Sequence, residues 1–490
     1  MSAELESHFN QFAGHIIGNG TTFTSEYGIV PLVYADWAAS GRWYQPLEQQ
    51  LVEDHGKFIG NPHTESNITG GTSTASYHAA RENIRRHIGA NEEDVLIMAG
   101  SGMTDAVARL QAILGWRIPE RFANDVYVAE EDRPVIFISE AEHHSNDISW
   151  REQNLADVVL IPGDPSGIVD TLALRSLVQT YKDRRTKVAA ITAASNVTGI
   201  RPPIHEVAEI MHQQDGLCFV DYTCAAPYDD INMHPSDEAA LDAIYFSPHK
   251  FLGGPGAPGV LAFNKRLYGD LKAPVQPGGG TVRWTNPWGE RSYYGTQDRH
   301  DIEDREDGGT PPFIGTIRAA LAIDLKEAMG INRMALREDE ICEQVFDELR
   351  STEGVHILAD EQQARIPIFA MTIDGLHYNA AAKLLNDRYG IQTRGGCACA
   401  GTYGHKLFGI DISQSHQITH AIDRGDLSNK PGFLRASFHP TMPSSQISYI
   451  TQSIAEVASK GPGWIEDYYY DKESNEFSML PAARQRFGQR

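Results

Sequence analysis

The sequence predicts an α/β protein with a large domain, built on a mostly parallel mixed sheet, and a smaller C-terminal α/β domain. Three observations support this prediction. Short apolar runs alternate with helical segments along most of the chain. Several of the apolar runs are continuous, as in strands buried on both faces. The length of 490 residues also exceeds what one hydrophobic core usually supports.

The apolar runs place most of the strands in the first two thirds of the chain. The predicted strands of the large domain are 94–100, 134–139, 158–162, 188–194, 218–222, 243–246 and 259–263, with helices between them, such as 104–114 and 172–181. Helices predicted at 314–329 and 334–350 lead into a second cluster, with strands at 355–358, 366–373 and 433–438 and helices at 379–388 and 445–459.

These elements divide the chain into four parts. We predict an N-terminal arm over 1–30, a large domain over 31–329, a small domain over 330–460 and a C-terminal tail over 461–490 that packs loosely. Residues 281–306 are polar and aromatic without strong periodicity, so we expect a functional loop there that could reach a partner subunit.

Composition excludes several classes of protein. The formal charge of −23 opposes general binding to nucleic acid. No apolar run approaches the roughly 20 residues of a membrane helix, and the first residues lack a secretory signal pattern. Five cysteines do not form a disulfide framework in a chain of this length. We therefore expect a cytoplasmic protein that binds neither membrane nor nucleic acid.

The most informative segment is Ile244–Gly259, which reads I-Y-F-S-P-H-K-F-L-G-G-P-G-A-P-G. A short apolar strand ends there by presenting Lys250 to a glycine-rich loop. Such a lysine is suited to forming a Schiff base, and the glycines allow the backbone to approach a bound group closely. By itself, the segment is equally compatible with a surface lysine beside an ordinary turn.

Further motifs remove this ambiguity. S-P-H-K-F-L-G-G-P-G resembles the S-x-H-K-x-x-G-P-x-G segment of the class V aminotransferase and cysteine desulfurase family. Residues 32–41, 60–64 and 306–311 resemble three other segments of the same family, and the likeness extends over about 31–460. The resemblance implies the PLP-dependent transferase fold type I, pyridoxal 5′-phosphate (PLP) as the cofactor, and Lys250 as the Schiff-base lysine.

The other groups that PLP requires have candidates in the same register. Asp221 ends a predicted strand 29 residues before Lys250, where the resemblance implies the acid that faces the pyridine nitrogen. By itself, an acid in this position would often be a helix cap. The family often has Gln three residues further on, and this chain has Cys224, whose role stays open.

A glycine-rich turn before a helix predicts the phosphate site. In Gly100–Asp105 the backbone N–H groups of Met103 and Thr104 and the Thr104 hydroxyl are the candidates, although an ordinary turn between strand and helix would look the same. The resemblance implies further contacts from Ser247 and His249.

Two more residues are implied to contact the ring. The E-H-H-x-N segment implies that His143 stacks on the ring and moves protons, with His144 the weaker candidate. No spacing of carboxylates or cysteines completes a metal site around the histidine pair. Asn196 in S-N-V-T-G is implied to reach the ring hydroxyl and the substrate carboxylate, although Asn is also a common turn residue.

Substrate contacts are predicted in the last third of the chain. Arg435 lies inside the apolar run 433–438, where a guanidinium is costly unless paired, and an arginine fork fits a carboxylate. The segment R-G-G-C-A-C-A resembles the cysteine loop of SufS-type desulfurases and molybdenum-cofactor sulfurases. In that register Arg394 belongs to the substrate site and Cys399 forms the persulfide, while Cys397 occupies a position often held by His.

The sequence therefore predicts a cysteine desulfurase that acts as a homodimer and could pass sulfur to an acceptor protein. The dimer is implied by the family, with Thr310 and residues 278–285 as candidates for groups contributed across the interface. The alternatives that keep the cofactor are a class V aminotransferase, an epimerase or a C–S lyase that acts on another amino acid. A binding or scaffold protein with the same fold is a further alternative.

Overall fold

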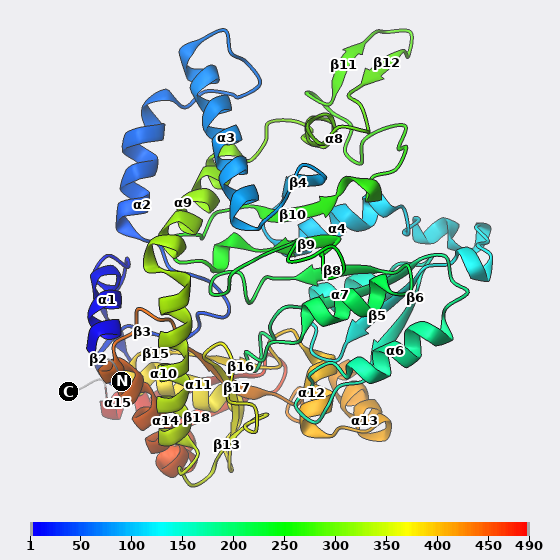
Figure 1. The fold of residues 1–490 in the computed structure, drawn as a ribbon. Helices are drawn as coiled ribbons and strands as arrows, with labels where there is room; N and C mark the ends of the chain where they lie inside the picture. Colours follow the sequence, from blue (N-terminus) through cyan, green and yellow to red (C-terminus); the bar gives the residue numbers. More distant parts are fainter. Residues whose placement is uncertain (1–2, 488–490) are drawn as a thin grey trace.

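The computed structural model describes residues 3–487 and is organised around one large sheet (Figure 1). Its seven strands lie in the order β4-β10-β9-β8-β7-β5-β6. They are β4 (Asp94–Ala99), β5 (Val135–Ser139), β6 (Asp157–Ile161), β7 (Lys187–Thr192), β8 (Leu217–Asp221), β9 (Ala243–Phe246) and β10 (Gly259–Asn264). Strands β5 to β9 pair in parallel, and β10 pairs antiparallel to both β4 and β9. The predicted mostly parallel mixed sheet is confirmed.

Helices cover both faces of this sheet, because the inner strands are apolar on both faces. On β5, Val135 and Phe137 belong to one core cluster, and Ile136 and Ile138 belong to another. The helices that pack on the first cluster are α3 (Ile68–His87), α6 (Thr171–Thr180), α7 (Ile204–His212) and α9 (Phe313–Met329). The second cluster is covered by α4 (Met103–Leu114), α5 (His144–Arg151) and α8 (Arg299–Glu306).

A second, smaller sheet is formed by the C-terminal part of the chain. Its strand order is β13-β14-β17-β16, with β13 (Val355–Ile357), β14 (Ile368–Ile373), β16 (Arg394–Gly396) and β17 (Phe433–Ser437), all antiparallel. The helices of this part are α10 (Ile331–Leu349), α11 (Tyr378–Tyr389), α12 (Gly401–Phe408), α13 (Ile412–Asp423) and α14 (Ser444–Trp464). Strand β17 is internal, so Arg435 lies in the middle of the sheet.

The N-terminal residues pack against this smaller part. They form α1 (Ala3–Ala13), the hairpin β1 (Thr22–Ser25) and β2 (Gly28–Pro31), then β3 (Val33–Tyr34) and α2 (Gln45–Gln50). Strand β3 pairs in parallel with β15 (Ile391–Gln392), and the Ser437 N–H donates to the Ala35 carbonyl at 2.8 Å. This pairing brings Asp36 beside β17.

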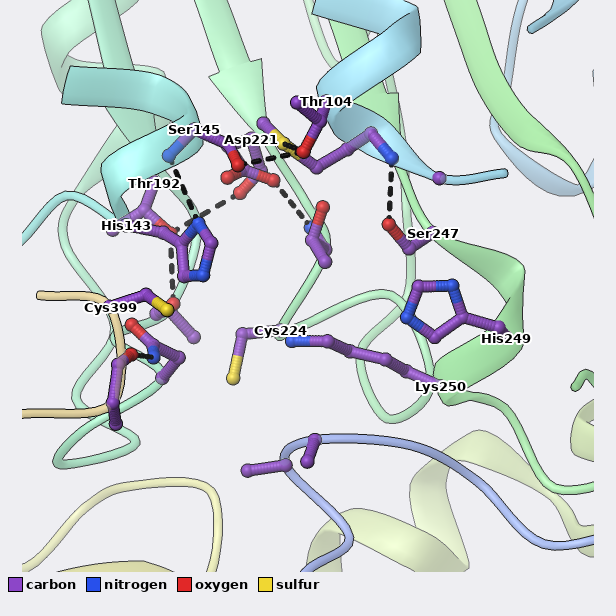
Figure 2. A pocket seen from close by; sticks show the side chains of 18 of the residues that line it. Thr104, His143, Ser145, Thr192, Asp221, Cys224, Ser247, His249, Lys250 and Cys399 are labelled. Carbon is purple, nitrogen blue, oxygen red and sulfur yellow. Dashed lines mark hydrogen bonds between the residues drawn. The ribbon is translucent and has the colours of Figure 1, made fainter. Parts of the chain in front are cut away.

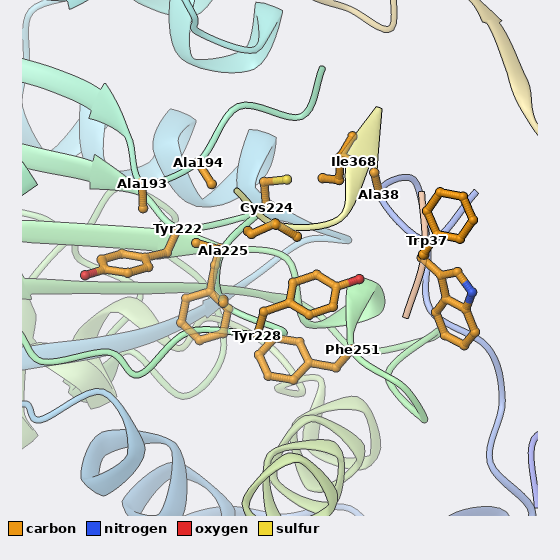
Figure 3. Close-up of a cluster of buried hydrophobic side chains, with 14 of the residues drawn as sticks. Trp37, Ala38, Ala193, Ala194, Tyr222, Cys224, Ala225, Tyr228, Phe251 and Ile368 are labelled. Carbon is orange, nitrogen blue, oxygen red and sulfur yellow. The ribbon is translucent and has the colours of Figure 1, made fainter. Parts of the chain in front are cut away.

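The apolar core of the large sheet extends to the place where the N-terminal residues meet the smaller sheet. Figure 3 shows Tyr228 and Phe251 packed beneath Cys224, with Trp37 and Ile368 at the far side of the cluster. The segments that carry Lys250 and Asp36 are therefore anchored by one shared core.

Residues 281–306, predicted as a loop, contain regular secondary structure. It contains a hairpin, β11 (Val282–Thr285) with β12 (Arg291–Tyr293), followed by helix α8. Apolar periodicity is missing because α8 buries mostly charged residues. Glu303, for example, forms ion pairs with Arg81 and Arg85, all three side chains being buried.

The prediction that the tail packs loosely is wrong for residues 461–487, while 488–490 lie outside the described residues. Helix α14 continues to Trp464, and a hairpin of β18 (Tyr468–Asp471) and β19 (Glu476–Met479) precedes α15 (Pro481–Phe487). The buried Tyr468 hydroxyl donates to Asp387 of α11 at 2.9 Å. Tyr468 thus has a structural role. Among residues 3–487, no helix combines the length and apolarity needed to cross a membrane.

Candidate active site

A cavity of about 380 Å³ opens where the carboxyl ends of the parallel strands meet the cysteine loop of the smaller sheet (Figure 2). Such strand ends are the usual ligand-binding edge of an open α/β sheet. All eleven residues predicted for the site line this cavity: Met103, Thr104, His143, Asn196, Asp221, Ser247, His249, Lys250, Arg394, Cys399 and Arg435. Cys224 also lines the cavity, whereas Cys397 does not.

Asp221 and Lys250 lie at the ends of adjacent parallel strands. Asp221 is the last residue of β8, and its Oδ1 accepts a hydrogen bond from the Thr223 N–H at 2.9 Å. Burial raises the pKa of Asp221 and lowers the pKa of Lys250. Lys250 follows β9 in a short turn. The nearby Cys224 thiol donates to the Ser195 carbonyl at 3.6 Å. A buried acid and an amine of lowered pKa thus share one end of the cavity.

The first turn of α4 forms another wall. The Met103 N–H donates to Ser247 Oγ at 2.8 Å, so this predicted anion donor is already hydrogen-bonded. Thr104 Oγ1 lies 2.7 Å from Ser145 Oγ. A Cβ on Gly102 would lie 3.0 Å from Ser247 Oγ and 3.3 Å from the His249 ring. The missing side chain at Gly102 therefore keeps this wall open to a bound group.

His143 is the N-cap of α5, and its half-buried ring lines the cavity. Its Nδ1 accepts a hydrogen bond from the Ser145 N–H at 3.1 Å. Burial and the nearby charge of Lys250 lower the pKa of His143 to about 3. The ring is therefore neutral near pH 7 and carries its proton on Nε2.

Glu142 supports this wall from behind, and sequence reasoning assigned it no role. Its carboxyl group accepts hydrogen bonds from the Ser139 hydroxyl, the Asn146 amide and the Thr192 N–H. Burial raises the pKa of Glu142 to about 8. Glu142 stands directly before His143 in the predicted segment, so the residue was visible in the sequence, but its burial was not.

Arg394 and Arg435 lie directly opposite each other on β16 and β17. Like charges in this arrangement repel. Asp36 accepts hydrogen bonds from both guanidinium groups, at 2.8 Å in each case. Arg435 also donates to the Asn196 carbonyl at 2.8 Å, and its Nε is buried without a partner among the described residues. Sequence reasoning gave Asp36 no role, although it is a carboxylate in an otherwise apolar segment.

The cysteine loop forms the mouth of the cavity. Cys399 is exposed, and Cys397 is half-buried. The Ala400 N–H donates to the Cys397 carbonyl at 3.0 Å, and the two central residues, Ala398 and Cys399, have φ values of 48° and 56°. Positive φ at both central positions is typical of a type I′ β-turn. In non-glycine residues it costs roughly 1–2 kcal/mol per residue.

Asn196 connects this turn to the large sheet. Its Nδ2 donates to the Ala398 carbonyl at 2.7 Å, while its Oδ1 is buried without a partner among the described residues. The amide therefore has an acceptor left for a bound group. Within residues 3–487, no group of three or more His, Cys, Asp or Glu side chains is placed to hold a metal ion.

The comparisons with known proteins agree with one another on the family. The family model described as aminotransferase class-V matches residues 33–450. A probable cysteine desulfurase from Halalkalibacterium halodurans is 30% identical over 374 residues, which cover 76% of this chain and 84% of that protein. One from Vibrio cholerae is 28% identical over 375 residues, covering 76% and 85%.

Solved structures show the same fold. The apo structure of a cysteine desulfurase from Thermococcus onnurineus is similar with a TM-score of 0.70 and 21% identity, covering 87% of this chain and 95% of the other. A cysteine desulfurase from Escherichia coli gives a TM-score of 0.68 and 21% identity, covering 92% and 98%.

Proposed function

Because this chain belongs to the aminotransferase class-V family, we propose that it is a PLP-dependent cysteine desulfurase. It would convert L-cysteine to L-alanine and retain the sulfur as a persulfide on Cys399. One observation carries this proposal: the exposed thiol of Cys399 lines the same cavity as Lys250, Asp221 and His143.

The residues of the cavity fit PLP. Lys250 supplies an amine, and the buried Asp221 supplies a carboxylate for the pyridine nitrogen. The unpartnered Asn196 Oδ1 and the open space over Gly102 leave room for polar contacts with the cofactor. The Thr104 hydroxyl, Ser247 and His249 would hold its phosphate. When bound, PLP supplies an electron sink for the bonds around the substrate α-carbon.

Lys250 and His143 would be the acid–base residues of this chain. Burial lowers the pKa of Lys250, which makes its proton easier to remove, and the deprotonated amine can accept a proton from the substrate α-carbon. The neutral His143 ring can donate from Nε2 and recover a proton there. Arg394 and Arg435 orient the substrate carboxylate beside the Asp36 carboxylate, which limits the excess positive charge.

With PLP as the electron sink, Cys399 would be the one protein group that takes up the substrate sulfur. The Cys399 thiolate attacks the γ-sulfur of cysteine, an S–S bond forms, and the Cβ–S bond of the substrate breaks. The electron pair of that bond stays with the substrate carbon, which takes up a proton and leaves as alanine. Cysteine and one protein thiol thus give alanine and one protein persulfide, without any external oxidant.

The test is the intact mass of the PLP-loaded protein after exposure to L-cysteine without reductant. We expect one added sulfur atom in the wild type and in Cys397→Ala, and none in Cys399→Ala. Sulfur retained by Cys399→Ala but lost in Cys397→Ala would move the carrier to Cys397. No added sulfur in the wild type, with PLP attached, would favour an aminotransferase, an epimerase or a C–S lyase.

We also propose that the enzyme is a homodimer. Phe58, Ile59 and Ile314 are exposed by 41%, 47% and 42% and line one surface cavity together. Next to this patch, Asn61 donates to the Thr310 hydroxyl at 3.1 Å, and Thr310 is one of the interface candidates named from the sequence. An apolar cluster of this kind is typical of an interface. Ile314→Glu is expected to shift the mass measured by light scattering from dimer to monomer.

The thiols support two further proposals, a cytoplasmic location and a sulfur-acceptor protein. All five cysteines are unpaired, and the reactive candidate is exposed. Free thiols persist in reducing compartments, so we place the enzyme in the cytoplasm. An exposed Cys399 can be reached by the thiol of an acceptor protein. Detection of a labelled sulfur on such a thiol after incubation with L-cysteine would test this transfer.

A further inference from the structure

His144 contacts the cysteine turn through its backbone and through its side chain. Its N–H donates to the Cys399 carbonyl at 2.7 Å, and its ring Nε2 accepts from the Gly401 N–H at 2.9 Å. The two bonds lie on either side of Ala400. One residue of α5 thus contacts the turn through its backbone and the start of α12 through its side chain.

The second of these bonds replaces a missing helix cap. Helix α12 begins at Gly401, and its N-cap residue, Ala400, has no side chain that could accept a hydrogen bond. The first N–H groups of a helix have no acceptor within the helix. A polar side chain at the N-cap normally supplies one. Here the acceptor comes from α5 in the large domain.

His144 is suited to this role at neutral pH. Its Nε2 can accept only in the neutral ring, and burial lowers the pKa of His144. The His144 side chain does not line the cavity. Its influence on the chemistry must therefore pass through the backbone of the cysteine turn.

The turn needs such external support, because its conformation is unfavourable. Ala398 and Cys399 both have positive φ values, and neither is glycine. Strained conformations of this kind persist when surrounding contacts impose them. The hydrogen bonds that reach the turn from the large sheet include those of His144 and the bond from Asn196 to the Ala398 carbonyl.

We propose that His144 is a positioning residue: it holds the turn that carries Cys399 at the mouth of the cavity by capping α12 from the neighbouring helix. The role in sulfur transfer rests on the proposed function, but the cap itself does not. Loss of the cap lets the turn relax, so that the thiol spends less time in reach of the substrate sulfur. Binding of PLP and of the amino acid should be unaffected.

The experiment compares the PLP-loaded wild type with His144→Ala, His144→Gln and Thr402→Val. The Gln side chain can place an amide oxygen near the position of Nε2 and should restore the acceptor. Thr402 is the matched control, because its hydroxyl donates to Asp147 of α5 at 2.6 Å. It links the same two helices without contacting the Gly401 N–H.

Two measurements are made on each protein. Hydrogen exchange, resolved to the Gly401 amide, reports the cap directly, and steady-state alanine release reports kcat and KM. In His144→Ala we expect exchange at Gly401 to accelerate about tenfold, since a hydrogen bond contributes roughly that factor. We expect kcat to fall about tenfold, while KM stays within about twofold. His144→Gln should recover most of both losses, and Thr402→Val should resemble the wild type.

Several results would overturn the proposal. A Gly401 amide that exchanges without protection in the wild type would overturn it. This measurement needs no variant, so it still applies if His144→Ala does not fold. Unchanged exchange in His144→Ala, or an equal loss of kcat in Thr402→Val, would show that the imidazole acceptor is not what holds the turn. If the wild type forms no persulfide while exchange at Gly401 follows the expected pattern, the proposed function fails and the cap stands.

Discussion

Arg435 donates a hydrogen bond to Asp36 at 2.8 Å, although 399 residues separate them in the chain. The contact joins the segment after β3 to the middle of the smaller sheet. Arg394 shares the same carboxylate from the opposite strand. One acid thus neutralises two arginines that would otherwise repel, and both stay aimed at the cavity.

Removal of Asp36 is predicted to cost much more stability than removal of Arg394. The Arg435 side chain is only 3% exposed, whereas that of Arg394 is 50% exposed. Asp36→Ala leaves a buried charge unpaired and should cost about 3 kcal/mol. Arg394→Ala breaks a partly exposed pair and should cost about 0.5 kcal/mol. The midpoints of urea unfolding measure the difference, and equal losses would contradict it.

Gly41→Ala is predicted to displace the turn that carries Lys250. A Cβ at this position would lie 1.9 Å from the Phe251 carbonyl oxygen and 3.0 Å from that of Lys250. Such overpacking costs about 3 kcal/mol, and it should reduce the PLP retained after gel filtration. Gly14→Ala is the control, because its Cβ would have no neighbour within 4 Å. A Gly41→Ala protein that retains full stability and PLP would disprove the close approach.

His143 is predicted to make the protein less stable as the pH falls. The pKa of His143 is lowered to about 3, first by burial and then by Lys250, from an ordinary value of about 6.5. Between these values the unfolded chain binds a proton that the folded chain does not, so stability rises with pH. Lowering the pH from 6.5 to 4.5 should therefore reduce the free energy of unfolding by about 2 kcal/mol through this one group.

The measurement is urea unfolding of PLP-free protein at both pH values. His143→Asn can keep a side-chain acceptor for the Ser145 N–H, since Asn is a good N-cap, but does not titrate. The variant should therefore lose less stability than the wild type over this interval. An identical loss in both proteins would mean that His143 keeps an ordinary pKa.

The cysteines are predicted to react with iodoacetamide in order of exposure. Cys399 is exposed and should react first, followed by the half-buried Cys397. Burial raises the pKa of Cys224, so its thiolate is scarce and shielded even though it lines the cavity. Peptide mass spectrometry over time gives the order, and alkylation in urea confirms that all five can react. Labelling of Cys224 as fast as Cys399 would contradict this assignment.

The large sheet could be predicted because each of its strands appears in the sequence as a short apolar run. Continuous apolar runs such as 188–194 can be satisfied only by burial on both faces, which fixes them as inner strands between helices. The same pattern is missing in α8, because four of its five buried residues are charged and only Ile302 is apolar. Charge pairs follow no sequence period, so they could not be predicted before the partners Arg81 and Arg85 on α3 are known.

For the site, local motifs and their family resemblance were enough to predict which residue types gather in the cavity: a lysine after a strand, an acid at the end of another, and a cysteine among small residues. The contacts that support these residues became visible only in the folded chain. Asp36 between two arginines, Glu142 behind His143 and His144 against the cysteine turn depend on contacts between distant segments. Local sequence cannot encode such pairs, because burial and hydrogen-bond partners arise only when separate elements pack together.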